Sequence, residues 1–196
     1  RKILLCVGGA DSAPAFREVL KDDIRASFVR TLVEAARDHG YDGLDLDMEP
    51  MEPRDAVVYA TFVRELRAAL NGWNRSALLT AAAGELPETF AGLQGQFDQI
   101  NLMTYALSGA WEGWVTWHNS ALRNGGLKFP GTSRELPSVD AKVREWLAAG
   151  IAPGKLGLGV AFYGYVWSGA SGPRQPIQGV TTADVSYANL MRTYFE

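Results

Sequence analysis

The sequence predicts an α/β fold in which about five parallel β-strands alternate with crossover helices. Short apolar runs of strand length recur along the chain, and the segments between them have apolar residues at every third or fourth position. Such runs are typical of parallel strands, because helices cover both faces of a parallel sheet. Since a strand follows each helix, right-handed crossovers are the expected connections.

Each expected strand is a short, mainly apolar run. The five runs are residues 3–7, 44–48, 77–83, 100–105 and 155–162. The first run ends at Gly8 and Gly9, and its continuous apolar character predicts a strand that is buried on both faces.

The expected helices have the spacing of an amphipathic helix and typical end residues. They cover about residues 24–36, 58–69 and 138–149. Ser138 is a typical N-cap, and Gly40 and Gly150 are typical of residues that follow a helix. Trp146 falls on the apolar stripe of the third helix, so we expect it to pack in the core.

Two long segments, 107–137 and 164–196, interrupt the alternation and are rich in glycine and aromatic residues. Segments of this length without a strong pattern are usually functional loops or small inserted subdomains. Both leave the C-terminal ends of strands, where barrel enzymes build their active sites.

The composition is that of an ordinary globular domain, with 196 residues, 47% of them apolar and 21% charged. A net charge of −3 gives no electrostatic basis for binding nucleic acid or an anionic membrane. Cys6 is the only cysteine, which excludes an intrachain disulfide. No apolar run approaches the roughly 18 residues of a membrane span, and the apolar start is too short for a signal peptide. Because a strand begins almost at Arg1, we expect the chain to be a fragment of a longer domain.

An acidic strand is the most informative feature of the sequence. Because alternate residues of a strand share a face, Asp45, Asp47 and Glu49 point to one side and the apolar residues between them to the other. Three carboxylates on one side of a buried strand repel one another, which raises the pKa of at least one of them. A raised pKa suits a general acid, and Glu49 at the C-terminal end of the strand reaches furthest into a cleft.

Two other interpretations of the acidic strand stay open at this point. The strand can be a solvated edge strand without a catalytic role, although the flanking helices argue against exposure. Alternating carboxylates also suit Mg²⁺ or Ca²⁺. Neither histidine supports a metal site, because His39 closes a helix and His118 lies in a loop.

Residues 42–49 match, at every fixed position, the Asp-Gly-x-Asp-x-Asp-x-Glu signature of the family 18 glycoside hydrolases, the chitinases. The chain resembles this family along almost its whole length. Four further segments resemble its third, fifth, sixth and seventh barrel strands, in that order: residues 4–9, 78–82, 101–105 with the Met-x-Tyr motif, and 155–164 with Phe-Tyr-Gly. The resemblance implies a (β/α)8 TIM-barrel type of fold that is incomplete in this chain. Residues 1–196 are then one partial catalytic domain, and 164–196 begin an inserted subdomain.

The resemblance also implies a mechanism, namely retaining hydrolysis in which the substrate's acetamido oxygen is the nucleophile. By position, Glu49 is the general acid and then the base, Asp47 stabilises the acetamido nitrogen, and Asp45 supports Asp47. Tyr105 positions the acetamido oxygen, and Met103 lines the floor of that subsite. We expect no metal and no cofactor.

Aromatic residues in the two long segments suit a carbohydrate ligand, because flat sugar faces stack on aromatic rings. Trp111, in the family's Gly-x-Trp pattern, and Tyr163 are the expected substrate-binding residues, although core packing is the better explanation for each aromatic residue taken alone. The implied ligand is chitin or a chitooligosaccharide, and the implied location is extracellular. Three explanations of the missing strands stay open: they lie in segments outside this sequence, a second chain completes the barrel, or the chain is a truncated product.

Several positions differ from the family pattern. Ala106 replaces the Asp or Asn that usually follows the Met-x-Tyr tyrosine, and Tyr165 replaces a common arginine. These changes suggest altered substrate subsites. They leave two alternatives to an endo-acting chitinase: a glycan-binding, lectin-like protein with a degenerate site, and an N-acetylglucosaminidase acting on peptidoglycan or N-glycans. Retention of Glu49 favours an enzyme.

Overall fold

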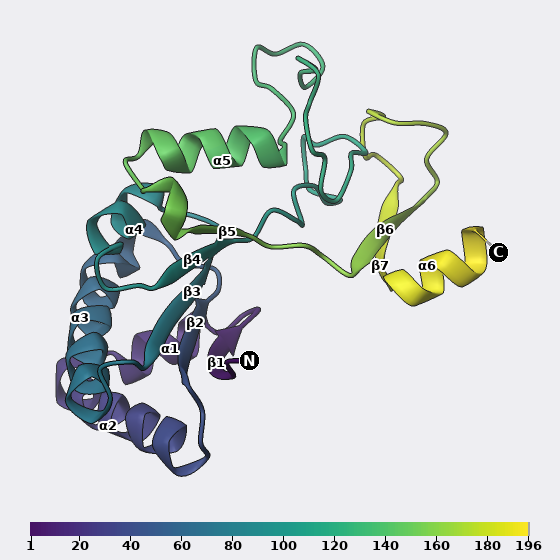
Figure 1. Cartoon of the computed structure of the whole chain (residues 1–196). Helices are drawn as coiled ribbons and strands as arrows, with labels where there is room; N and C mark the ends of the chain where they lie inside the picture. The colour runs from purple at the N-terminus through teal and green to yellow at the C-terminus, as the bar shows by residue number, and fades with distance from the viewer. Residues whose placement is uncertain (196) are drawn as a thin grey trace. The chain divides into compact units, whose positions relative to one another are not determined.

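The computed structural model describes residues 1–195, and Figure 1 shows the course of the chain through them. The elements are β1 (Leu4–Gly9), α1 (Ala13–Val19), α2 (Asp22–Asp38), β2 (Gly43–Met48), α3 (Ala56–Trp73), β3 (Leu78–Ala83), α4 (Pro87–Leu93), β4 (Gln99–Leu102), α5 (Val139–Ala148), β5 (Leu156–Leu158), β6 (Tyr163–Ser168), β7 (Thr181–Ser186) and α6 (Tyr187–Tyr194). Short 3₁₀ turns at Pro53–Asp55 and Pro153–Lys155 precede α3 and β5.

The described residues form two compact units. The first consists of Arg1–Leu102 and Trp146–Gly157, and the second of Met103–Glu145 and the chain from Leu158 onward. The first unit contains the expected parallel sheet, in the strand order β1-β2-β3-β4-β5. β1 pairs with β2, β2 with β3, and β3 with β4, each in parallel. The α/β class with five strands in one sheet is therefore confirmed.

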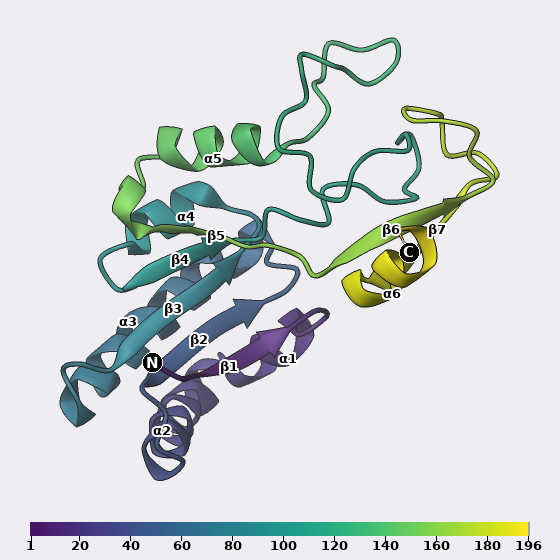
Figure 2. The same ribbon diagram turned by 45° about the vertical axis from the view of Figure 1, so that its right-hand side comes forward.

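The core of the first unit lies between the sheet and its helices. Figure 2 shows α2, α3 and α4 on one face of the sheet. The residues of β2 and β3 that face these helices alternate with less buried ones, so that Leu44, Leu46 and Leu79 are fully buried. Phe62 and Leu66 of α3 are buried in the same core. Complete burial of one such side chain contributes roughly 1.5–3 kcal/mol.

Helix ends follow the expected capping. After α2, Gly40 has a φ of 73°, and the amide of Tyr41 donates to the carbonyl of Ala36 at 2.8 Å, which closes the helix. Before α5, the hydroxyl of Ser138 accepts a hydrogen bond from the amide of Ala141 at 3.2 Å, as the N-cap prediction requires.

The structure corrects three details of the expected strands. β1 is not buried on both faces, because Cys6 lies opposite Asp45, on the acidic face of the sheet, and is exposed. β4 ends at Leu102 instead of residue 105, and β5 covers only Leu156–Leu158. Beyond β4, the hydroxyl of Thr104 donates to the carbonyl of Gly159 at 2.6 Å. A side-chain hydrogen bond therefore links the two segments where the backbone hydrogen bonds of the sheet have ended.

The second unit is built from the two long segments. β6 and β7 pair as an antiparallel hairpin, with Tyr163 opposite Ser186 and Ser168 opposite Thr181. The loop over residues 107–137 has a small apolar core of its own. This core consists of Val115, Trp117, Ala121, Phe129 and Leu136. No helix in the part of the chain that the structure describes has both the length and the apolarity needed to cross a membrane.

Candidate active site

Strand β2 separates its side chains into an apolar and an acidic face. Leu44 and Leu46 are fully buried against the helices, whereas Asp45, Asp47 and Glu49 are only half-buried on the opposite face. Apolar and acidic residues alternate along this strand, and because successive side chains of a strand point to opposite faces, the alternation produces the separation. The sheet therefore brings the three predicted carboxylates together on one surface of the first unit.

Asp45 is anchored by both neighbouring strands. It lies opposite Cys6 of β1 and Thr80 of β3 in the parallel registers. The hydroxyl of Thr80 donates a hydrogen bond to Oδ1 of Asp45, and the thiol of Cys6 also hydrogen-bonds this carboxylate. Cys6 is exposed at the surface, but partial desolvation of the thiol, followed by the charge of Asp45, raises its pKa to about 11, so the thiol stays protonated and remains a donor.

Asp47 and Glu49 form a hydrogen-bonded pair. Burial is the main cause that raises the pKa of both groups. The negative charge of Asp47 and its hydrogen bond from Glu49 raise the pKa of Glu49 further, to about 7. Glu85 and Asp11 add smaller contributions in the same direction. Glu49 therefore holds a proton near neutral pH, which is the state that a general acid needs.

One oxygen of Asp47 is an unpaired acceptor. Oδ1 of Asp47 is buried and makes no hydrogen bond to any part of residues 1–195. Buried polar atoms are almost always paired, so an unpaired acceptor beside a raised-pKa carboxyl marks a place where a donor from a ligand fits.

The loop after β1 holds the end of β2. The hydroxyl of Ser12 donates to the carbonyl of Asp47 at 3.0 Å and accepts from the amide of Glu49 at 3.2 Å. The amide of Ala13 donates to the carbonyl of Glu49 at 2.8 Å. The backbone on both sides of the predicted acid is thus fixed from β1 and α1.

The loop after β2 is fixed by a partly buried ion pair. Asp55 is 2% exposed and accepts two hydrogen bonds from the guanidinium of Arg17, both of 2.8 Å. The side chain of Glu52 and that of Asp55 also form a capping box at the start of the 3₁₀ turn. The hydrogen bonds from Arg17 lower the pKa of Asp55 below its ordinary value.

The other predicted site residues belong to the second unit. Met103 and Tyr105 are half-buried just after β4, and the ring of Tyr105 lies 6.1 Å from that of Tyr163 in an edge-to-face arrangement. Trp111 is 47% exposed and packs edge-to-face on Trp114 at 4.5 Å. An exposed ring with a fixed orientation suits stacking on a sugar.

Ala106 has an unusual backbone conformation. Its φ is 51°, in the left-handed region that alanine rarely adopts. Its amide donates to Oδ1 of Asn119 at 2.7 Å, which holds the loop in this form. Asn and Asp, which the sequence resemblance predicts at this position, tolerate this conformation better than alanine.

Sequence reasoning placed Trp146 correctly in the core, where it is fully buried and lies 5.4 Å from the ring of Phe90. It missed Ser12, Thr80 and the pair of Arg17 and Asp55. The site contacts of Ser12 and Thr80 depend on which residues lie opposite in the neighbouring strand, and no local pattern reveals them. Among the residues that the structure describes, no group of three or more His, Cys, Asp or Glu side chains is arranged to hold a metal ion.

Comparison with known proteins identifies related sequences. Residues 1–193 match the family model "Glycosyl hydrolases family 18". A "Class V chitinase" of Arabidopsis thaliana is 32% identical over 182 residues, which cover 85% of this chain and 46% of the relative. "Chitinase B" of Serratia marcescens is 30% identical over 185 residues, covering 76% of this chain and 36% of the relative. The chain spans about half or less of the length of these relatives.

Solved structures agree with the sequence comparison. A chitinase from Bacillus thuringiensis has a TM-score of 0.83 at 26% identity and covers 96% of this chain, which spans 36% of that structure. A family 18 N-acetylglucosaminidase from Paenibacillus barengoltzii has a TM-score of 0.84 at 26% identity. The match covers 98% of this chain and 62% of that structure. A Cycas revoluta chitinase in complex with (GlcNAc)3 has a TM-score of 0.79 at 27% identity. The match covers 97% of this chain and 60% of that structure.

Proposed function

The chain belongs to the glycosyl hydrolases of family 18, and we propose that it is an endo-acting chitinase that cleaves β-1,4-linked N-acetylglucosamine polymers with retention of configuration. The observation that supports this proposal most strongly is the hydrogen-bonded pair of Asp47 and Glu49 at the C-terminal end of β2, with the pKa of Glu49 raised to about 7. A carboxyl with this pKa is half protonated at neutral pH, so it can donate a proton and afterwards accept one.

In the first step, Glu49 donates its proton to the glycosidic oxygen as the bond from that oxygen to the anomeric carbon breaks. The acetamido oxygen of the same sugar attacks the anomeric carbon and forms a cyclic oxazolinium ion. In the second step, the Glu49 carboxylate takes a proton from water while the water oxygen opens the ring. The sugar keeps its configuration because the anomeric carbon is inverted twice.

We assign Asp47 the task of stabilising the oxazolinium ion. Its buried Oδ1 has no partner among residues 1–195, and the acetamido N–H of the substrate is a donor that satisfies it. As positive charge develops on that nitrogen, the carboxylate stabilises it electrostatically. Asp45, held by Thr80 and Cys6, keeps the neighbouring carboxylate in place.

We assign substrate-binding roles to four residues of the second unit. Tyr105 is to donate a hydrogen bond to the acetamido oxygen and orient it for attack, which lowers the entropic cost of ring closure. Met103 is to line that subsite, and Trp111 and Tyr163 are to bind neighbouring sugars. The half-buried positions of Met103, Tyr105 and Tyr163, and the exposed ring of Trp111, support these assignments.

The test is hydrolysis of soluble chitin pentamer by the Glu49→Gln variant. The substitution removes the transferable proton and changes little volume, so we expect hydrolysis to fall by roughly 10²–10⁴-fold with binding retained. The matched control is Glu145→Gln, which makes the same change on the exposed surface of α5 and should keep the wild-type rate. If Glu49→Gln kept more than about a tenth of that rate, Glu49 would not be the acid.

A glycan-binding protein of the same fold is the second candidate, and Ala106 is the observation that favours it. A methyl group there offers no hydrogen bond to a distorted sugar. Wild-type chain that binds the pentamer without releasing products would establish this candidate. An N-acetylglucosaminidase differs in its products, because it releases single sugars from the chain end.

Chitin is an insoluble polymer outside cells, so the proposed activity implies secretion of the native protein. Detection of the native protein in the medium around the cells that produce it tests this point. Retention inside the cell would contradict chitin as the substrate.

A further inference from the structure

A row of aromatic side chains runs along one face of β6. Tyr163, Tyr165 and Trp167 alternate in the strand and therefore share a face. Their ring centroids are 6.3 Å and 6.1 Å apart in sequence order. Tyr105, the proposed acetamido-positioning residue, joins the same row at 6.1 Å from Tyr163. The three strand residues span roughly 13 Å of backbone, which is longer than a single pyranose ring.

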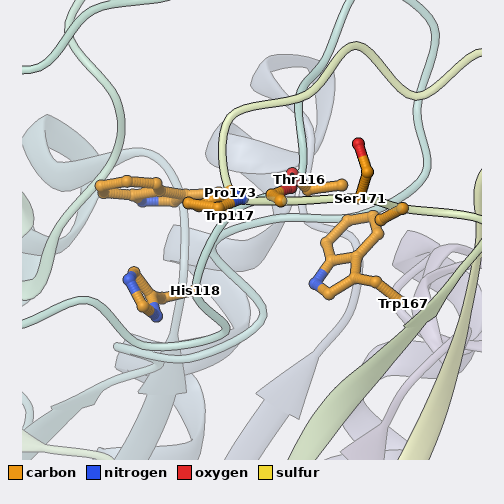
Figure 3. A pocket seen from close by; sticks show the side chains of 8 residues that line it. Thr116, Trp117, His118, Trp167, Ser171 and Pro173 are labelled. Carbon is orange, nitrogen blue, oxygen red and sulfur yellow. Dashed lines mark hydrogen bonds between the residues drawn. The ribbon is translucent and has the colours of Figure 1, made fainter.

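The row ends at a pocket within the second unit. The pocket has a volume of about 420 Å³, within the roughly 300–1,000 Å³ typical of small-molecule sites. Figure 3 shows the rings of His118 and Trp167 on opposite sides of it, with Trp117 and Pro173 along a third side. His118 is exposed and Trp167 half-buried, so both rings are accessible from the pocket.

The two loops that form the pocket are tied together by the backbone. The amide of Thr116 donates to the carbonyl of Gln175 at 2.8 Å, and the amide of Arg174 donates to the carbonyl of Thr116 at 2.8 Å. The hydroxyl of Thr116 also donates to the carbonyl of Gly172 at 2.9 Å. The ring of Trp117 is fixed by a hydrogen bond from Nε1 to the carbonyl of Pro137 at 2.8 Å. A pocket held in this way is formed before the ligand arrives, which reduces the entropic cost of binding.

We propose that this pocket is an additional saccharide-binding subsite, which takes an N-acetylhexosamine residue of a chain that also occupies the row from Tyr105 to Trp167. The inference rests on the proposed function, because it assumes a chitooligosaccharide substrate. The apolar face of the pyranose ring stacks on the indole of Trp167, and the imidazole of His118 hydrogen-bonds its hydroxyl or acetamido groups. Tyr165, where the family commonly has an arginine, continues the stacking surface between the two ends of the row.

The experiment compares the affinities of a chitin trimer and a chitin hexamer by calorimetry, in the inactive Glu49→Gln background of the full chain. We expect Trp167→Ala to weaken hexamer binding by roughly three- to tenfold and to leave trimer binding unchanged. His118→Ala changes an exposed residue, so it should fold normally and show a smaller loss in the same direction. Trp73→Ala, which removes another half-buried tryptophan, is the matched control and should change neither affinity.

The outcomes separate this inference from the proposed function. Unchanged hexamer affinity in both pocket variants, or an equal loss for trimer and hexamer, would overturn the subsite. If the Glu49→Gln chain bound neither oligomer, the proposed function would fail and the subsite with it. A third outcome would refute only the subsite. In it, the wild-type chain cleaves the hexamer, and adding Trp167→Ala to the Glu49→Gln chain leaves its affinity for the hexamer unchanged.

Discussion

At the scale of residues, the site depends on carboxyl groups whose environments differ although they lie on one strand. Asp45 is held by donors from β1 and β3, whereas Asp47 and Glu49 share a hydrogen bond and are partly buried. Burial penalises the charged form, and a neighbouring charge penalises it further. This difference gives Glu49 a protonated state near pH 7, which its ordinary pKa would not allow.

The raised pKa of Glu49 predicts two pH dependences with definite signs. Above about pH 7 Glu49, the proposed general acid, loses its proton, so hydrolysis should decline on the alkaline side. The folded state binds this proton more tightly than the unfolded state. The stabilisation is therefore complete below the ordinary pKa of glutamate and is lost as the pH rises through about 7. Urea unfolding at pH 5 and pH 8 measures it, and Glu49→Gln should flatten the difference. An unchanged difference in that variant would assign the pH dependence to other groups.

The conformation of Ala106 predicts separate effects on stability and on activity. With a φ of 51°, Ala106→Gly should stabilise the fold by up to about 1 kcal/mol, because glycine adopts this region without strain. Ala106→Asp should raise the turnover of chitin pentamer, because it restores a polar group beside Tyr105. Thermal unfolding and initial rates measure the two effects. A gain in turnover with Ala106→Gly alone would show that backbone strain, and not the missing carboxylate, limits the wild type.

At the scale of elements, the close approach of β1 and β2 fixes the position of the acidic end of β2. Gly8 has a φ of 117° and lies so near β2 that a β-carbon would sit 1.9 Å from the carbonyl oxygen of Asp47. Only glycine permits this contact, which lets the loop beyond β1 bring Ser12 against the backbone of Asp47 and Glu49. Glycine at the end of β1 therefore helps to position Glu49, the proposed acid.

Substitution at Gly8 and at its neighbour separates contact from backbone strain. Gly8→Ala should lower the free energy of unfolding by roughly 2 kcal/mol or more, because it adds a backbone clash to an unfavourable φ. Gly9→Ala has a similar φ of 115° but open space around the added carbon, so it should cost less. Denaturant titration of both variants gives the comparison. Equal losses of unfolding free energy in the two variants would mean that the structure relieves the clash at Gly8 without an energetic cost.

At the scale of the whole molecule, the sequence predicts those strands and helices that have a regular local pattern of apolar and polar residues. The sheet and the acidic face of β2 follow from a period of two and from short apolar runs, and α2 and α3 from helical spacing. The short helices α1 and α4 have seven residues each, too few to establish a periodic pattern. β6 and β7 were missed because twelve residues, 169–180, separate them, so no tight-turn signal joins them.

The contacts that complete the site were beyond sequence reasoning for a different reason. Arg17 and Asp55 are 38 residues apart, and Thr80 and Asp45 are 35 apart. Each pair meets because two elements pack in one register, which is a property of the folded chain. The same holds for the pocket between residues 116–118 and 170–173, whose walls come from two long segments that lack a predictive pattern.

The anomeric configuration of the first products that this chain releases from chitin pentamer tests the central claim most directly, and proton NMR during the first minutes of hydrolysis records it. The account predicts that the β-anomer appears first and slowly equilibrates with the α-anomer, because the acetamido group and then water each invert the anomeric carbon. Products that begin as the α-anomer would contradict it, because a single displacement by water would then replace the oxazolinium ion.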